Sequence, residues 1–247
     1  RPPRSTPLYS SAASDVYKRQ GFPLQVVKMT LKKRACNVNP KPLVAQRIKR
    51  LSSIAIKLEQ NPTMRLTQMQ DIGGCRAVML KVGEVDKLVK IYEVARAKNP
   101  DRGAVLVAKT NYVERPKHDG YRGVHLIMKF QSRGKPEYNG QKIEIQIRST
   151  LQHAWATAVE TSQTFTGQAL KSKLKAADPK WLRFFALVSS AIAARERMPS
   201  VPGTPDTVVE RADELRQIDE SERIVASLAG WNTAIQHQQV VAPDAFA

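Results

Sequence analysis

The sequence predicts an α+β fold in which one mixed β-sheet is flanked by helices. Between residues 75 and 149 the predicted elements follow in the order strand, helix, strand, strand, strand, with helical segments on both sides. Ile143, Ile145 and Ile147 alternate with polar residues, which is the period of a half-buried strand. The length of 247 residues and the hydrophobic content of 42% are sufficient for one large core.

Helical spacing is clearest early in the chain. We expect one amphipathic helix after Pro42 that ends before Asn61-Pro62. Its apolar face would hold Val44, Ile48, Leu51, Ala55 and Leu58. The other segments, by the same patterns, are strands at 75–80, 104–113, 123–131 and 141–149, and helices at 84–98, 149–165, 179–196 and 206–222.

Three stretches are expected along the chain. Residues 1–20 resemble a translated sequencing-adapter end ("SSAASDVYKRQ"), so we expect them to be an artefact and disordered. We expect residues 21–200 to form the main domain with its flanking helices. The Pro/Gly-rich stretch "MPSVPGTP" (198–205) predicts a linker. We expect residues 201–247 to comprise linker and a C-terminal helical segment, in a chain truncated at both ends.

Composition restricts the partners. The formal net charge of +18 favours polyanions such as nucleotides and RNA, with a merely basic soluble protein as the alternative. Cys36 and Cys75 lie far apart, without metal or disulfide spacing, and a reducing, cytoplasmic location is expected. No apolar run is long enough to cross a membrane, so no membrane partner is expected. The oligomeric state is left open.

Four separated motifs follow one another along the chain: "RIKRLSSIAIKL", "DIGGCR", "YVERPKHDGYRGVH" and "IEIQIRS". In order and spacing they resemble the RelA/SpoT synthetase-domain family of alarmone synthetases, over about residues 43 to 165. The resemblance implies the nucleotidyltransferase-like RelA/SpoT synthetase fold. It also implies magnesium-dependent transfer of pyrophosphate from ATP to GDP or GTP, which makes (p)ppGpp.

The resemblance also implies roles for individual residues. Asp71 and Glu144 would bind Mg²⁺, which prefers oxygen ligands, and Glu144 would accept the hydroxyl proton. Gln146 would orient Glu144 or contact a base or ribose. The implied donor-nucleotide residues are Arg47, Lys49, Ser53, Lys57 and Arg76. The implied acceptor-binding residues are Lys117, Tyr121, His125 and Arg148.

Several of these residues also have a purely structural interpretation. Tyr121 is expected to be partly exposed and to stack on the acceptor base, but a turn aromatic folded onto the sheet would look the same. His125 could be a hydrogen-bonded strand histidine, and Asp71 a turn residue before Gly73. His118-Asp119 spells the dipeptide of HD-type phosphohydrolases, but the chain has only four histidines, so we expect no hydrolase activity.

Two departures from the family pattern concern the acceptor. Asn111-Tyr112 stands where an Asp-Tyr pair is usual, and Gly123 where a small hydroxyl residue is common. "YRGVHL" and "LQHAWATAVETSQTFTGQALKS" resemble a toxic subgroup of small alarmone synthetases. That resemblance implies the alternative function, a toxic pyrophosphokinase that modifies the 3′-terminal adenosine of tRNA, with an antitoxin-like segment expected to be missing from this chain. A second alternative is a non-catalytic nucleotide- or RNA-binding protein, which the retention of Asp71 and Glu144 disfavours.

Overall fold

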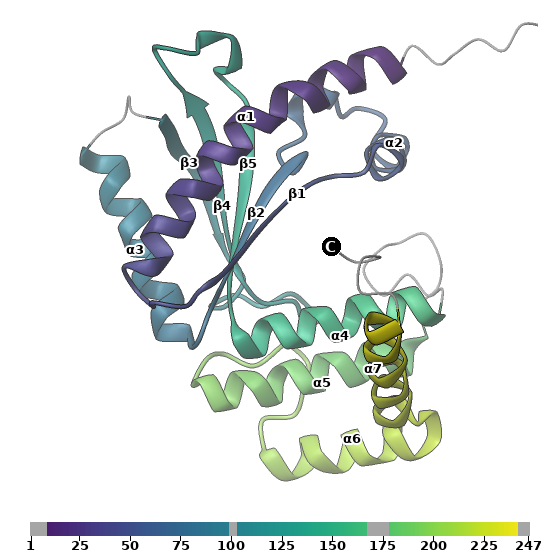
Figure 1. Cartoon of the computed structure of the whole chain (residues 1–247). Coiled ribbons are helices and arrows are strands. Elements are labelled where there is room, and N and C mark those ends of the chain that lie inside the picture. The colour runs from purple at the N-terminus through teal and green to yellow at the C-terminus, as the bar shows by residue number, and fades with distance from the viewer. Residues whose placement is uncertain (1–8, 99–102, 167–177, 242–247) are drawn as a thin grey trace, which may run out of the picture. The chain divides into compact units, whose positions relative to one another are not determined.

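The computed structural model describes residues 9–98, 103–166 and 178–241 (Figure 1). The chain forms two compact units. Unit 1 runs to Thr110 and also includes Gly123–Ser149, whereas unit 2 comprises Asn111–Arg122 and the chain from Thr150 onward. This division differs from the boundary that we expected near residue 200, because the helices after Ser149 cluster with one another.

Unit 1 is built on a five-stranded mixed sheet, which confirms the predicted fold class. The strand order is β1-β2-β5-β4-β3. β5 pairs in parallel with β2 and antiparallel with β4, and β1 pairs antiparallel with β2. The strands are β1 Leu43–Ile48, β2 Gly73–Met79, β3 Gly103–Asn111, β4 Val124–Gln131 and β5 Lys142–Ser149.

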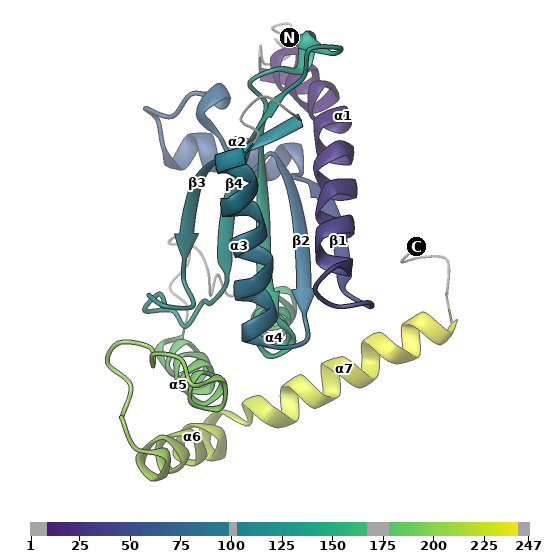
Figure 2. The same cartoon turned by 90° about the vertical axis from the view of Figure 1, so that its left-hand side faces the viewer.

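Helices α1 (Tyr9–Cys36) and α3 (Val82–Lys98) pack on the isoleucine face of this sheet (Figures 1 and 2). The approach of α1 is close at Gly73, where a Cβ atom would lie 2.9 Å from Gln20 Oε1 of α1 and 2.8 Å from Ile143 Cδ1 of β5. The guanidinium of Arg34 in α1 lies 4.3 Å from the ring centroid of Tyr92 in α3. The opposite, polar face of the sheet carries the candidate site.

Helix α1 corrects one prediction. Of residues 1–20, which we expected to be disordered, 9–20 form its first part and 1–8 lie outside the described residues. Gln20 is buried, and its side-chain amide donates a hydrogen bond to the Gln141 side chain at 2.7 Å. This contact with a residue about 120 positions away could not be read from local sequence.

The segment after Pro42 corrects a second prediction. The expected single helix is instead strand β1 followed by helix α2 (Leu51–Gln60). The backbone of β1 is paired from Leu43↔Val78 to Ile48↔Gly73, and these hydrogen bonds override the helical spacing. Leu51, expected to pack inward, is 47% exposed, while Ile54 is the buried residue of α2.

The remaining strands and helices predicted in the described ranges are confirmed within a few residues. The helices of unit 2 are α4 Thr150–Thr166, α5 Pro179–Glu196, α6 Val208–Glu222 and α7 Ile224–Val241. Short 3₁₀ turns occur in unit 1 at Leu66–Gln68 and Pro136–Tyr138. No described helix is long and apolar enough to serve as a membrane span.

The core of unit 2 is aromatic. Trp181 stacks on Trp231 with ring centroids 5.9 Å apart, and Trp231 also stacks on Phe165 at 5.2 Å. The loop before β4 is anchored here by Arg122, which is 2% exposed and donates to Ser189 Oγ and to the carbonyls of Val113 and Pro199. Burial lowers the pKa of Arg122 to about 10, so it remains charged at neutral pH.

Candidate active site

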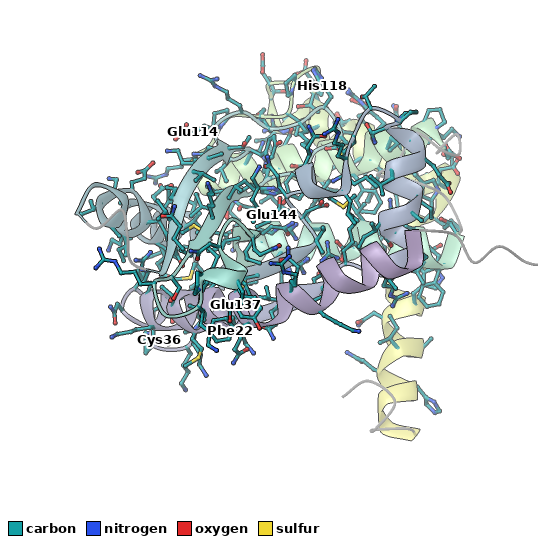
Figure 3. The ribbon with its side chains drawn as sticks, turned by 90° about the horizontal axis from the view of Figure 1, so that it is seen from above. Phe22, Cys36, Glu114, His118, Glu137 and Glu144 are labelled. Carbon is teal, nitrogen blue, oxygen red and sulfur yellow. The ribbon has the colours of Figure 1, made fainter. Side chains whose placement is uncertain are left out.

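The polar face of the sheet gathers predicted site residues from four strands. Opposed residues on paired strands project to the same side, and the registers His125↔Gln146, Arg76↔Gln146 and Glu144↔Gly74 place these positions in adjacent rows. Arg47 on β1 lies opposite Gly74. The residues on this face are Arg47, Arg76, His125, Glu144, Gln146 and Arg148. In Figure 3, Glu144 lies away from Phe22 of α1.

Glu144 is the centre of a hydrogen-bond chain. His125 Nδ1 lies 2.8 Å from one carboxylate oxygen, and the Gln146 amide donates to the other at 2.9 Å. Arg148 donates to the Gln146 carbonyl at 2.9 Å, so the Gln146 NH₂ group is directed at Glu144. Each carboxylate oxygen is thus held by a different donor, which fixes the orientation of the group.

The charge state of Glu144 follows from these contacts. Burial by itself would raise the pKa of Glu144, but hydrogen bonding to His125 and to Gln146 outweighs burial and lowers the pKa below its ordinary value. The negative charge of Asp71 acts in the raising direction. Glu144 is therefore ionised at neutral pH, and the two predicted carboxylates interact electrostatically.

Asp71 is clamped by two lysines. Lys49 Nζ donates to Asp71 Oδ2 and Lys57 Nζ donates to Oδ1, both at 2.8 Å. The three side chains are 20 to 33% exposed. Burial alone would raise the pKa of Asp71, but the two lysines lower it below its ordinary value.

Helix α2 places Lys57 beside Asp71. Ile54 and Leu58 share one side of α2 at i,i+4 spacing and pack with Met69 and Ile72, the residues that flank Asp71 closely in sequence. Seating this apolar side sets the position of the helix. Ser53 and Lys57 lie on α2 as predicted. Arg47 instead lies on β1, and Lys49 is the first residue after that strand.

Asp71 and Glu144 would supply only some of the ligands of a magnesium ion. Mg²⁺ commonly takes one or two carboxylates and completes its octahedron with water and substrate phosphates. In the described parts of the chain, no group of three or more His, Cys, Asp and Glu side chains could hold a metal ion. Asp71 and Glu144 are both ionised, so this donor set fits an ion that arrives with a phosphorylated ligand.

Lys117 and Tyr121 belong to unit 2, where they form a compact turn. Lys117 Nζ lies 4.6 Å from the Tyr112 ring centroid and 5.3 Å from that of Tyr121. The Asp119 side chain accepts from Tyr121 N at 2.9 Å. Tyr121 is 8% exposed and packs in the aromatic core of unit 2, which corrects our expectation of a partly exposed ring.

Two features of this loop were missed from sequence. Asn111 Oδ1 accepts from the backbone N–H groups of Val113 and Glu114 at 3.0 and 3.3 Å. An aspartate would accept the same bonds, so the departure from the family's Asp keeps the turn. The buried anchor Arg122 was also missed, since an arginine after a Gly-Tyr turn carries no local signal of burial.

Comparison with known proteins places this chain among relatives. Residues 46–168 match the family model described as the region found in RelA/SpoT proteins. The chain is 29% identical over 130 residues to the uncharacterized protein Rv1366 of Mycobacterium tuberculosis, covering 52% of this chain and 42% of that protein. It is 29% identical over 121 residues to the GTP pyrophosphokinase YjbM of Bacillus subtilis, covering 48% and 54%. The chain thus spans about half the length of these curated relatives.

Solved structures share the fold. The small alarmone synthetase 1 from Bacillus subtilis superposes with a TM-score of 0.58 at 21% identity, covering 76% of this chain and 92% of that chain. A structure of that synthetase bound to its product pppGpp gives a TM-score of 0.55 at 22% identity, covering 73% and 89%. At such identities the likeness concerns the arrangement of helices and strands.

Proposed function

We propose that this chain, which belongs to the RelA/SpoT family through residues 46–168, transfers pyrophosphate from ATP to the ribose 3′-hydroxyl of GDP or GTP. The observation that carries the proposal is the ionised Glu144 carboxylate, held between His125 and Gln146 on the polar face of the sheet. A related protein named a GTP pyrophosphokinase, and a shared fold in a protein bound to pppGpp, support this class of acceptor.

In the proposed reaction, the acceptor oxygen attacks the β-phosphorus of ATP. The bond from that phosphorus to the α,β-bridging oxygen breaks, and AMP leaves with the bonding electron pair. The hydroxyl proton passes to Glu144. Because phosphoryl-transfer transition states are loose in most analyses, this proton leaves late, and a carboxylate of lowered pKa is a sufficient base.

Donor binding uses the lysines that now hold Asp71. Lys49 and Lys57 would turn from the Asp71 oxygens to the phosphates of ATP, and Arg47 and Arg76 would bind the rest of the donor from the same face of the sheet. Ser53 would add a hydroxyl donor from α2. Asp71, released from the lysines, and Glu144 would hold Mg²⁺, which when bound neutralises charge on the transferred phosphates.

Several residues are assigned to binding of the acceptor. Lys117 would meet acceptor phosphates, and Tyr121 would contribute through the ring that shares Lys117 with Tyr112. His125 and Arg148, predicted to contact acceptor phosphates, would in addition keep Glu144 oriented through the hydrogen-bond chain.

The acceptor can be identified directly. The protein is incubated with Mg²⁺ and ATP labelled on its γ-phosphate, together with GDP, GTP or bulk tRNA, and the labelled product is separated. Label in GDP or GTP, with AMP formed in equal amount, is the expected result. Label in tRNA alone would replace the acceptor with an RNA end, and no label in any acceptor would contradict the proposal.

Lys57→Ala tests the donor assignment. Removing a charge-assisted hydrogen bond to phosphate costs about 1.5–3 kcal/mol, so the KM for ATP should rise roughly tenfold or more. Lys90→Ala on the exposed side of α3 removes the same charge and should leave the KM unchanged. Equal KM values in the two variants would remove Lys57 from the ATP site.

A further inference from the structure

The polar face of the sheet continues beyond Glu144 into a basic end. Lys142 precedes Glu144 by two residues on β5, so both side chains project to the same side. Lys129 on β4 lies directly opposite Lys142. Like charges directly opposed on antiparallel strands are unfavourable, and this pair lies one row from Ile127↔Glu144.

Neither lysine is neutralised within the described parts of the chain. The side chains of Lys129 and Lys142 make no hydrogen bond or ion pair with any described residue. Lys129 is exposed and Lys142 is half-buried. Two lysines at directly opposed strand positions, without a described counter-ion, are suited to an anion beside them.

An open groove of about 600 Å³ includes Lys129 in its lining, and Lys142 lies opposite that residue on β5. The groove is lined by Lys129, Gln131 and Arg133 together with Ser132, Pro136, Asn139 and Gly140, and no acidic side chain among the described residues lines it. The hairpin that shapes it is held by Asn139, whose side chain accepts from Ser132 N at 2.7 Å and donates to Ser132 O at 3.2 Å. The groove is therefore formed before any ligand binds.

The distribution of charge supports an anionic ligand on this unit. Unit 1 contains 27 Lys and Arg against 9 Asp and Glu, whereas unit 2 contains 13 of each. The net charge of +18 thus resides in the unit that holds the sheet.

We propose that Lys129, Lys142 and Arg133 form a phosphate-binding subsite. The inference rests on the proposed function, because its ligand is the phosphate-bearing part of a substrate whose reacting hydroxyl lies at Glu144. Two residues along a strand span about 7 Å, which is the reach of a short phosphate chain. The phosphates belong either to a nucleotide polyphosphate or to an RNA backbone, and they share one recognition chemistry.

Binding measured without turnover tests the subsite. The wild type, K129T/K142T and the control K87A/K90A are titrated with inorganic tripolyphosphate, GTP and bulk tRNA. A non-hydrolysable ATP analogue is present at saturation to occupy the donor lysines. The control removes the same charge from exposed positions of α3. Threonine suits a strand, so K129T/K142T should keep a thermal midpoint at or above that of the wild type.

We expect K129T/K142T to weaken at least one ligand about tenfold or more while K87A/K90A leaves all three unchanged. Loss for tripolyphosphate and GTP identifies nucleotide phosphates. Loss for tRNA alone, with the slope of log affinity against log salt reduced by about 1.4 for two single-strand contacts, identifies an RNA backbone. Equal affinities of K129T/K142T and the control for every ligand would overturn the subsite. A loss of binding that is specific to K129T/K142T would support the subsite even if the protein transferred no pyrophosphate. The proposed subsite and the proposed transfer reaction can therefore fail separately.

Discussion

At the scale of single residues, both the backbone angle and the close neighbours of Gly120 require a glycine at this position. Its φ is +88°, and a Cβ atom there would lie 2.9 Å from Trp155 Cζ2, 3.1 Å from Ser189 Cβ and 3.2 Å from Ala186 Cα. Gly120→Ala should therefore destabilise unit 2 by about 2 kcal/mol or more. Gly230→Ala, with nothing within 4 Å on α7, should be neutral or gain up to about 1 kcal/mol.

Urea unfolding followed by tryptophan fluorescence measures this difference. All three tryptophans, Trp155, Trp181 and Trp231, lie in unit 2 and report on it. Equal unfolding free energies for the two alanine variants would show that the turn does not need a glycine.

The same scale holds a prediction about pH. The folded pKa of Glu144 is lowered mainly through His125, against burial, so the ionised, active form persists until the pH falls through that lowered value. The stability that this contact adds is present above the unfolded pKa and is lost over the same acidic fall. His125→Leu removes the donor, so the pKa should rise and the acid limb of the kcat/KM profile should move to higher pH. An unmoved acid limb would separate Glu144 from the titration that controls activity.

At the scale of elements, strand β5 and helix α2 show what local sequence can predict. The alternation of Ile143, Ile145 and Ile147 identified the buried face of β5 because a strand's period of two is a local property. The spacing from Val44 to Leu58 did not separate strand from helix, because only the non-local pairing of β1 with β2 makes the choice. The four ordered motifs identified most of the candidate site, whereas the bond of His125 to Glu144 depends on the register between β4 and β5.

Helix α2 yields a paired test of its buried side. Ile54 is 3% exposed and packs with Met69 and Ile72, while Leu51 is 47% exposed. Ile54→Ala should cost about 2–4 kcal/mol, and Leu51→Ala less than about 1 kcal/mol. Chemical unfolding followed by circular dichroism compares them. A larger loss for Leu51→Ala would restore the single-helix interpretation of residues 43–60.

At the scale of the whole molecule, the two units differ in charge and in the character of their cores. Unit 1 holds Asp71, Glu144 and the whole net charge, and unit 2 is charge-balanced, with its aromatic core supporting Lys117 and Tyr121. The expected boundary near residue 200 missed this division because helices α5 and α6 are joined by the ion pair of Arg183 with Glu214, a contact that linker composition does not predict. The +18 charge favoured a polyanion partner, and the structure assigns that charge to unit 1.

The central claim, that Glu144 on the sheet's polar face serves pyrophosphate transfer from ATP, is tested most directly by Glu144→Gln. This change keeps the side-chain volume and removes the charge and the proton acceptor. With γ-labelled ATP, Mg²⁺ and the acceptor that the wild type labels, the rate of acceptor labelling should fall by about 10²–10⁴-fold, while the thermal midpoint stays close to that of the wild type. A properly folded Glu144→Gln variant that labels the acceptor within a few-fold of the wild-type rate would contradict the account.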